Sequence, residues 1–147
     1  MSQLQYVAHP AGSADERFVA PELVLHDTSG MHLRGSRCRA CGALAFPRAQ
    51  VCAECLSLDV EDHQLPNEGT LYSFARVHQA PAGWDVPYFL GYIDLPDGLR
   101  VLAHLDDSAH SLSIGAQMRL TSGRVGQDAN GQAMFSYVFA PIDGGQK

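Results

Sequence analysis

Apolar and polar residues alternate along the second half of the chain. In the first run after Gly69, the residues Leu71, Ser73, Ala75 and Val77 alternate with bulkier side chains. A period of two places alternate side chains on opposite faces of a strand. Each such run is short, rich in branched and aromatic residues, and bounded by Gly, Pro, Asn or Asp. The pattern predicts five strands, at residues 70–79, 88–95, 100–105, 117–125 and 133–139.

Five short antiparallel strands in a row are typical of a small Greek-key barrel of the OB type. An SH3-like barrel would give much the same pattern, so the number of strands leaves both architectures open. Turn signals at residues 96–98 and 128–131 separate neighbouring strands. We therefore predict a mainly β chain in which residues 66–143 form a five-stranded OB-fold barrel.

The first 33 residues follow a less regular pattern. Residues 1–20 are polar, and Pro10 and Gly12 interrupt any period, which is typical of a terminal tail. Between residues 21 and 33, apolar positions lie on both sides of a turn-like sequence at 26–30. This arrangement fits two short strands or an irregular segment, and it does not favour a helix. Residues 1–33 are therefore predicted to be an irregular N-terminal tail or docking segment.

Four cysteines lie between this segment and the barrel. They form two CxxC pairs separated by ten residues: Cys38, Cys41, Cys52 and Cys55. In such a sequence each pair makes a tight knuckle, a hairpin brings the knuckles together, and four thiolates close a tetrahedron around Zn²⁺. Gly42 follows the first pair, where a left-handed turn is expected. We predict a rubredoxin-like zinc ribbon at residues 34–65 that binds one structural zinc ion.

Two alternatives for the cysteines are an iron ion in a rubredoxin-like site and a redox dithiol. A redox CxxC normally begins a helix in a βαβ unit, and the pattern predicts no such unit here. A module of this size has almost no core, so metal binding must hold it together. A closed shell of four sulfurs leaves no open position for a reactive water. Zinc in a structural role is therefore favoured.

Charge is unevenly distributed along the 147 residues. The formal net charge is −6, whereas proteins that bind nucleic acid usually have a basic surplus. Residues 28–53 contain four arginines and no acidic residue, and residues 54–68 contain five acidic residues and no basic one. The basic segment coincides with the cysteines. It is either an ordinary solvated surface or a docking face for a phosphate-bearing ligand or an acidic partner.

The sequence also bears on location. No stretch is long and apolar enough to predict a membrane helix. The N-terminus has neither the basic start nor the apolar run of a signal peptide. A cytoplasmic location is therefore predicted, and its reducing conditions favour metal binding over disulfides for the four cysteines.

No pattern predicts a catalytic site. The chain has no GxSxG, P-loop, GxGxxG or HExxH motif, and its histidines do not have the spacing of metal ligands or of a base and nucleophile. We assign no catalytic residue and predict a binding or assembly function. The loop 80–87 carries the only tryptophan, Trp84, between prolines. Trp84 is either an interface anchor or a side chain that folds back onto the end of the barrel.

Several segments together resemble one protein family. They are residues 33–42, 46–48, 51–55, 69–74, 87–88 and 91–95. Their combination resembles the zinc-ribbon plus OB-fold accessory proteins of acyl-CoA metabolism, the domain of unknown function 35 family. The resemblance spans residues 33–140. Many relatives have an N-terminal helix with a Phe-Trp pair before the ribbon, and the less regular segment 18–31 departs from that pattern.

The resemblance implies a non-catalytic accessory subunit. Family members accompany thiolase-fold enzymes such as thiolases, lyases and acyltransferases, and also hotdog-fold hydratases. It implies a hetero-oligomer in which this chain docks on a thiolase-like subunit and helps form its acyl-CoA site. Arg48 lies in the family's Phe-Pro-Arg stretch, where a guanidinium can bind a CoA phosphate in bidentate fashion. The residues assigned to CoA are Arg48, Phe74 and Trp84.

Two other functions stay open at this point. A single-stranded nucleic-acid-binding protein is one, because ribbons and OB folds both serve that role. It would need basic grooves interleaved with aromatic residues, whereas the arginines of the predicted barrel are scattered. A stand-alone hydrolase or acyltransferase is the other, and it would require turnover by the isolated chain.

Overall fold

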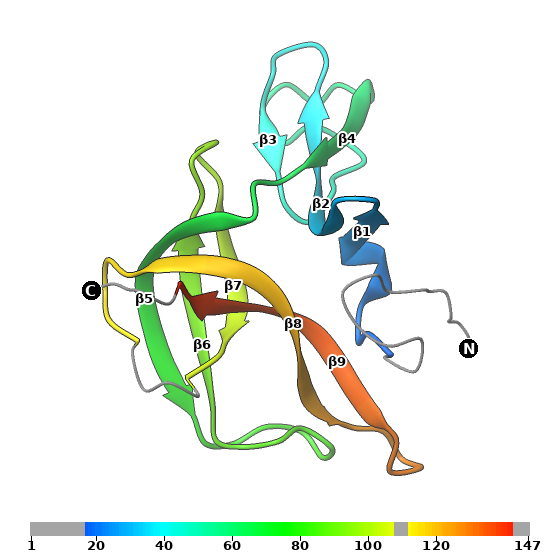
Figure 1. The fold of residues 1–147 in the computed structure, drawn as a ribbon. Coiled ribbons are helices and arrows are strands. Elements are labelled where there is room, and N and C mark those ends of the chain that lie inside the picture. The colour runs from blue at the N-terminus through cyan, green and yellow to red at the C-terminus, as the bar shows by residue number, and fades with distance from the viewer. Residues whose placement is uncertain (1–16, 108–111, 143–147) are drawn as a thin grey trace.

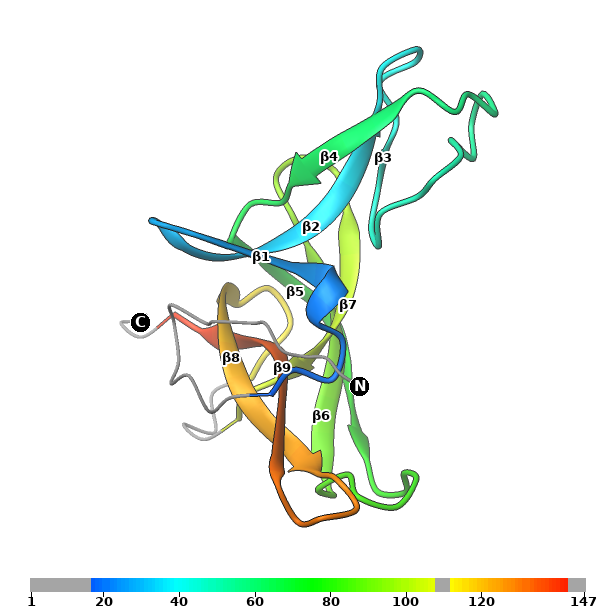
Figure 2. The same ribbon diagram turned by 90° about the vertical axis from the view of Figure 1, so that its right-hand side faces the viewer.

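The computed structural model describes residues 17–107 and 112–142. In these residues a four-stranded sheet, which includes the ribbon, precedes a closed five-stranded barrel. The ribbon lies at one end of an elongated molecule and the loop 78–87 lies at the other end (Figure 2). The described residues contain no helix of the length and apolarity needed to cross a membrane. The predicted fold class, a zinc ribbon followed by a five-stranded barrel, is confirmed.

The first sheet combines an N-terminal hairpin with the ribbon. Its elements are a 3-10 turn η2 (Pro21–Leu23) and strands β1 (Val24–Asp27), β2 (Gly30–Cys38), β3 (Leu44–Ala45) and β4 (Val60–Gln64). β2 pairs with β1, β3 and β4, always in the antiparallel sense. The segment 21–33, which fitted strands or an irregular path, therefore contains two strands. β2 continues from the hairpin into the ribbon without a break (Figure 1).

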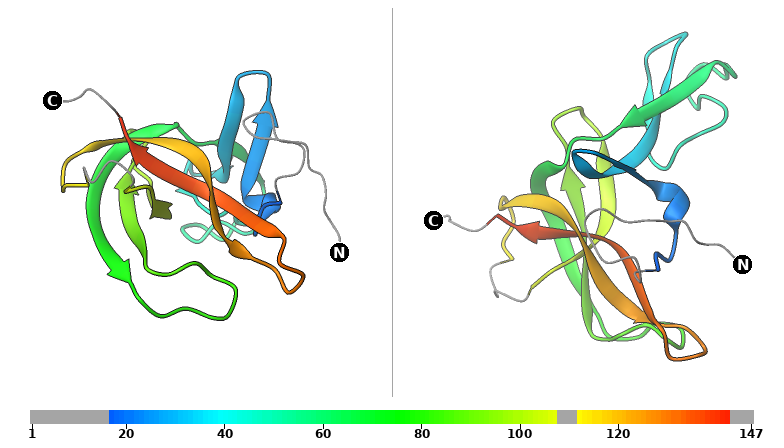
Figure 3. Two further views of the ribbon diagram at one scale, coloured as in Figure 1. Left: turned by 60° about the horizontal axis from the view of Figure 1, so that its bottom comes forward. Right: turned by 45° about the vertical axis from the view of Figure 1, so that its right-hand side comes forward.

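The barrel follows directly. Its strands are β5 (Glu68–Val77), β6 (Tyr88–Asp94), β7 (Arg100–Leu105), β8 (Gln117–Gln127) and β9 (Ala133–Pro141). The closed order is β5-β6-β7-β9-β8. β8 and β9 run side by side (Figure 3), and β9 closes the barrel through a parallel contact with β7. This crossover is a Greek-key connection, as an OB barrel requires.

A β-bulge in β5 changes which side chains face the interior. The register of β5 against β6 shifts between Leu71 and Ser73. Leu71 is buried, Tyr72 is exposed, and Phe74 is the next side chain that packs on the core. The simple alternation, which groups Ser73 with Leu71, is therefore wrong beyond this point, because a bulge inserts one extra residue and reverses the phase.

One hydrophobic core joins the two units. Leu33 of β2 and Leu65, just after β4, are almost completely buried in the same cluster as Phe139 of β9. Phe46 of the ribbon meets Tyr137 of β9 edge to face, with ring centroids 6.0 Å apart. The ribbon and the barrel are thus held together by continuous apolar packing.

The end of the predicted N-terminal tail also packs on the barrel. The Val19 N–H donates to the Phe135 carbonyl at 2.7 Å, and the Phe135 N–H donates to the Arg17 carbonyl at 2.6 Å. Phe18 between them is buried in the core. Residues 1–16 of the predicted tail lie outside the described residues. Residues 17–19 are therefore an added strand-like contact on β9.

Candidate functional site

The two cysteine pairs are held by equivalent backbone turns. The Gly42 N–H donates to the Cys38 carbonyl at 2.8 Å, and the Leu56 N–H donates to the Cys52 carbonyl at 2.9 Å. Both donors have a left-handed backbone, with φ of 83° at Gly42 and 67° at Leu56. The left-handed turn predicted at Gly42 is confirmed. The same turn at Leu56 was not predicted, because the residue there is not glycine.

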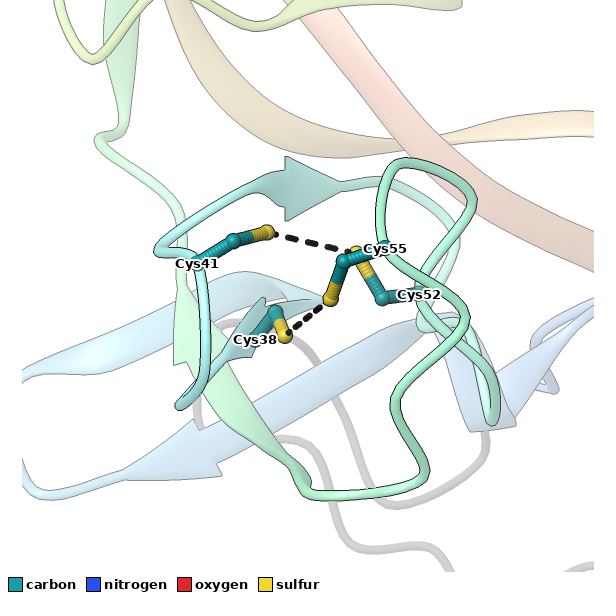
Figure 4. A group of neighbouring side chains, drawn as sticks. All are labelled: Cys38, Cys41, Cys52 and Cys55. Carbon is teal, nitrogen blue, oxygen red and sulfur yellow. Dashed lines mark hydrogen bonds between the residues drawn. The ribbon is translucent and has the colours of Figure 1, made fainter.

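The four cysteine side chains point toward one another from the two turns (Figure 4). Their sulfur atoms all lie within 4.8 Å of one another. The Sγ atoms of Cys38 and Cys55 are 3.6 Å apart, as are those of Cys41 and Cys52. A tetrahedral zinc site with Zn–S bonds near 2.3 Å has sulfur separations of about 3.8 Å. The thiols therefore fit a zinc ion with little movement.

Backbone groups favour thiolates in this cluster. The Cys41 N–H lowers the pKa of Cys38 to about 6, and the Cys55 N–H lowers the pKa of Cys52. At Cys55 the Ser57 N–H favours the thiolate, but the hydrogen bond with the Cys38 sulfur and burial outweigh it and raise the pKa of Cys55 to about 12. Adjacent thiolates repel one another, so one divalent cation is what allows all four to ionise together.

The arginines of the ribbon are paired with the acidic segment that follows it. The pairs are Arg34 and Arg48 with Asp62, and Arg37 and Arg39 with Glu61. The pairs of Arg34 and Arg37 form because β2 and β4 are neighbours, with Arg37 opposite Glu61. The Arg48 guanidinium holds the pKa of Asp62 below its usual value, and Arg39 does the same for Glu61. The basic segment is therefore a charge-compensated surface, not a free cationic one.

The three residues assigned to CoA lie in different environments. Arg48 is on the ribbon and bonds Asp62. Phe74 packs inside the barrel, with its ring 6.0 Å from that of Phe89. Trp84 belongs to the loop 78–87, and this loop lies at the opposite end of the molecule from the ribbon (Figure 2). This chain alone does not bring the three side chains into one pocket.

The loop that carries Trp84 is fixed against the barrel. The indole ring stacks on His104, with centroids 5.6 Å apart and an interplanar angle of 9°. The Gln127 N–H of β8 donates to the Gly83 carbonyl at 2.8 Å. Gly126 makes this approach feasible, because a Cβ atom there would lie 2.1 Å from the Gly83 carbonyl oxygen. Of the two orientations weighed from the sequence, the side chain adopts the one folded back on the barrel.

A cavity of about 450 Å³ opens beside this stack. It lies among β6, β7, β8 and β9, and Tyr88, His104, Ser122 and Arg124 are among the residues that line it. His104 stacks on Tyr88 at 4.4 Å, and burial lowers the pKa of His104. Its Nε2 atom has no hydrogen-bond partner among the described residues. Sequence reasoning missed this cavity, because its lining comes from four strands, β6 to β9, that the fold brings together.

Comparison with known proteins agrees with this geometry. The family model for the ChsH2 rubredoxin-like zinc ribbon domain matches residues 32–61, and the model for the ChsH2 C-terminal OB-fold domain matches residues 62–122. The chain belongs to the DUF35 family. The resemblance predicted from the sequence is thus confirmed. The ribbon family and the four converging thiols together support a structural zinc ion in this DUF35 protein.

Individual relatives extend the match along the DUF35 chain. "Benzoylsuccinyl-CoA thiolase subunit BbsA" of Thauera aromatica is 35% identical over 97% of this chain and 100% of that protein. A "DUF35 domain-containing scaffold protein" of Methanocaldococcus jannaschii is 30% identical over 76% of this chain and 82% of that protein. The solved "Ltp2-ChsH2(DUF35) aldolase" is 26% identical, with a TM-score of 0.58 over 75% of this chain and 84% of that one.

Proposed function

We propose that this DUF35 protein is a non-catalytic accessory subunit of a thiolase-fold enzyme of acyl-CoA metabolism, and that it works in the cytoplasm. The similarity to BbsA carries the proposal, because it covers 97% of this chain and the whole of that thiolase subunit. The match therefore includes both the zinc ribbon and the barrel of this chain. The enzyme partner is a thiolase, lyase or acyltransferase, and the assembly is a hetero-oligomer.

In this proposal the zinc ion is structural. Its ligands are Cys38, Cys41, Cys52 and Cys55. When bound, the ion supplies a cross-link between the two knuckles, because four protein ligands fill a tetrahedral shell. The backbone turns at Gly42 and Leu56 orient the thiols. The ribbon then presents a fixed surface, and the reaction takes place on the partner.

The finer part of the proposal concerns the acyl-CoA site. Arg48 is on the ribbon surface and already pairs with Asp62. Surface ion pairs of this kind contribute at most about 1 kcal/mol, so a CoA phosphate can replace Asp62 at little cost. Phe74 and Trp84 complete the assignment, with Phe74 shaping the barrel and Trp84 offering apolar surface at its end. The site is completed only when the partner is bound.

Affinity purification of the full chain from its native host tests the accessory role. We expect a thiolase-fold subunit to co-elute in stoichiometric amount and to be identified by mass spectrometry. Purified chain and subunit should then re-form the complex when mixed. Elution of the chain alone, or turnover of an acyl-CoA by the isolated chain, would contradict the proposal.

Binding of a CoA ester to the assembled complex tests the assignment of Arg48. Arg48→Ala should weaken binding about tenfold, the size expected for losing a charge-assisted hydrogen bond. Asp62→Asn should strengthen binding, because it removes the carboxylate that competes with phosphate. Arg119→Ala is the matched control, since Arg119 makes a similar exposed pair with Glu68 on the barrel. Equal affinities for all three variants would remove Arg48 from the site.

Single-stranded nucleic-acid binding has less support from the described residues. Eight of the nine arginines pair with carboxylates, and these are Arg17, Arg34, Arg37, Arg39, Arg48, Arg100, Arg119 and Arg124. The ninth, Arg76, lies over the Phe89 ring. A single-strand site instead requires cations that are free to follow a phosphate backbone. We therefore favour the accessory-subunit function.

A further inference from the structure

Three large side chains form an exposed apolar strip across the outside of the barrel. Tyr72 of β5, Tyr92 of β6 and Leu102 of β7 are 50%, 43% and 43% exposed. Tyr92 and Leu102 are direct partners across β6 and β7. Tyr72 is the bulged residue next to Ser73, which pairs with Tyr92. We name these three residues the β5–β7 face.

The strand pattern explains why these side chains point outward. On β6 the neighbours of Tyr92, Gly91 and Ile93, are buried, and on β7 Val101 and Ala103 are buried. Alternation therefore directs Tyr92 and Leu102 away from the core. The bulge turns Tyr72 to the same side. The exposed strip is a consequence of the barrel's own pairing, so it is held in place by rigid strands.

The charges next to the β5–β7 face are already neutralised. The Arg100 guanidinium lies 3.5 Å from the centroid of the Tyr72 ring. It also bonds both carboxylate oxygens of Asp94, at 2.5 Å from Nε and 3.2 Å from Nη2. The cation beside this face is therefore already paired with a carboxylate and is not free to bind a phosphate. A partner surface that matches the β5–β7 face therefore has no net charge.

The barrel also limits the mode of binding. Tyr92 lies on β6, which pairs with β5 on one side and with β7 on the other, so this strand offers no free edge to an added β-strand. Contact at this face must come from side chains. Tyrosine is enriched at protein interfaces because it supplies a large area with few rotatable bonds. The stacked Arg100 further restricts Tyr72.

The size of the face indicates what kind of partner covers it. A buried aromatic side chain removes about 150–250 Å² from water, so three half-exposed side chains offer on the order of 300 Å². Two copies of this chain that met through these faces would bury roughly 600 Å², well below the roughly 1,200–2,000 Å² of a stable interface. A partner with a larger surface is required, for which this strip is the central anchor.

We infer that the β5–β7 face docks on an uncharged, apolar surface of the thiolase-fold subunit. The inference rests on the proposed function and adds the surface through which the two subunits meet. Tyr92 and Leu102 lie at the centre of the contact, and Tyr72 with its stacked Arg100 lies beside them. The exposed leucine Leu58 on the ribbon lies outside it.

The test measures binding of purified variants to the separately purified thiolase-fold subunit, identified as described above, by biolayer interferometry. The variants are Tyr92→Thr and Leu102→Thr, which keep a residue that favours strands. Leu58→Thr is the control, since Leu58 is 77% exposed but lies on the ribbon. Zinc content and melting temperature are compared with the wild type. Oxidative footprinting of the wild-type complex provides a readout that needs no substitution.

We expect Tyr92→Thr and Leu102→Thr each to weaken binding at least tenfold, while Leu58→Thr changes it less than twofold. Tyr72 and Tyr92 should be protected from oxidation in the complex. If the wild type binds and both barrel variants bind with the same affinity, the inference is overturned and the proposed function stays intact. The same holds if the wild type binds but its tyrosines are not protected from oxidation. Concentration-dependent dimerisation that Tyr92→Thr abolishes would assign the face to a second copy. No binding by the wild type would refute the proposed function and the inference together.

Discussion

Gly42 and Leu56 occupy equivalent positions in the two metal-binding knuckles. Each donates its N–H to the carbonyl of the first cysteine of its pair, Cys38 or Cys52, and each has a positive φ. The two knuckles therefore share one backbone geometry. The position that requires a positive φ is occupied by glycine in one knuckle and by leucine in the other. Glycine adopts this geometry freely, whereas leucine does so at a cost of roughly 1–2 kcal/mol.

Leu56→Gly should stabilise the zinc-bound ribbon by up to about 1 kcal/mol, because it removes the strain at positive φ. Little burial is lost, since Leu56 is 75% exposed. The measurement is competition for zinc with a chelator, together with the melting temperature. Leu58→Gly is the control, as Leu58 is equally exposed and does not have a positive φ. If Leu56→Gly binds zinc no more tightly than Leu58→Gly, the strain does not exist.

Removal of zinc should unfold the ribbon and leave the barrel folded. The ribbon residues Leu44 and Phe46 are only partly buried, whereas barrel residues such as Ile93 and Phe139 are fully buried. We expect chelation to abolish hydrogen-exchange protection in β3 and β4 and to preserve it in β6 and β8. Cys52→Ser should have the same effect without a chelator. Equal loss of protection in both units would mean that they unfold together.

The fluorescence of Trp84 should report the protonation of His104. Trp84 is the only tryptophan and stacks on this imidazole, and an imidazolium quenches indole emission more strongly than the neutral ring. Burial lowers the pKa of His104 from 6.5. As the pH is lowered, the emission of Trp84 should therefore decrease with a midpoint below pH 6.5. His104→Gln should remove the transition.

The same group makes stability depend on pH. The unfolded chain takes up a proton at His104 more readily than the folded chain does. The stability that neutral, buried His104 contributes is therefore present above pH 6.5, the pKa of His104 in the unfolded chain. It is lost as the pH falls through the lower pKa of His104 in the folded chain. Denaturation of the wild type and His104→Gln at pH 7.5 and pH 5.5 measures it. A larger drop in the variant than in the wild type would contradict this sign.

Gly126→Ala should release the Trp84 loop. The new Cβ would meet the Gly83 carbonyl oxygen at 2.1 Å, and two backbone segments cannot adjust as a flexible side chain can. We expect a red shift of Trp84 emission and a loss of about 1–3 kcal/mol in stability, the usual range for overpacking. Ser122→Ala, in the same strand, should leave both unchanged. If the variant has wild-type emission, the close approach of the loop to β8 is not required to hold Trp84 in place.

The alternation of residues predicted the barrel well because alternation is a local property. Residues 100–105 were predicted as a strand and form β7 with the same bounds. The bulge at Tyr72 was not predictable, because it depends on the register with β6. The cysteine spacing predicted the convergence of the four thiols for the same local reason. It did not predict the strained turn at Leu56, where the residue type argues against a positive φ.

Features that depend on distant partners were not accessible from the sequence. The charge segments were visible, but their neutralisation depends on β2 and β4 being neighbours, which sets Arg37 against Glu61. The packing of residues 17–19 on β9 likewise joins the two ends of the described chain. The orientation of Trp84 was left open, because it is decided by His104 and by the absence of a side chain at Gly126.

The position of the ribbon in the chain sets an order of events during protein synthesis. All four thiols lie between Cys38 and Cys55, and β4, the last ribbon strand, ends at Gln64. The barrel closes only through β9, which ends at Pro141. At about 10 residues per second, the cysteines leave the ribosome several seconds before the last barrel strand does. The nascent chain can therefore acquire its metal first, and the barrel then assembles against a ribbon that is already formed.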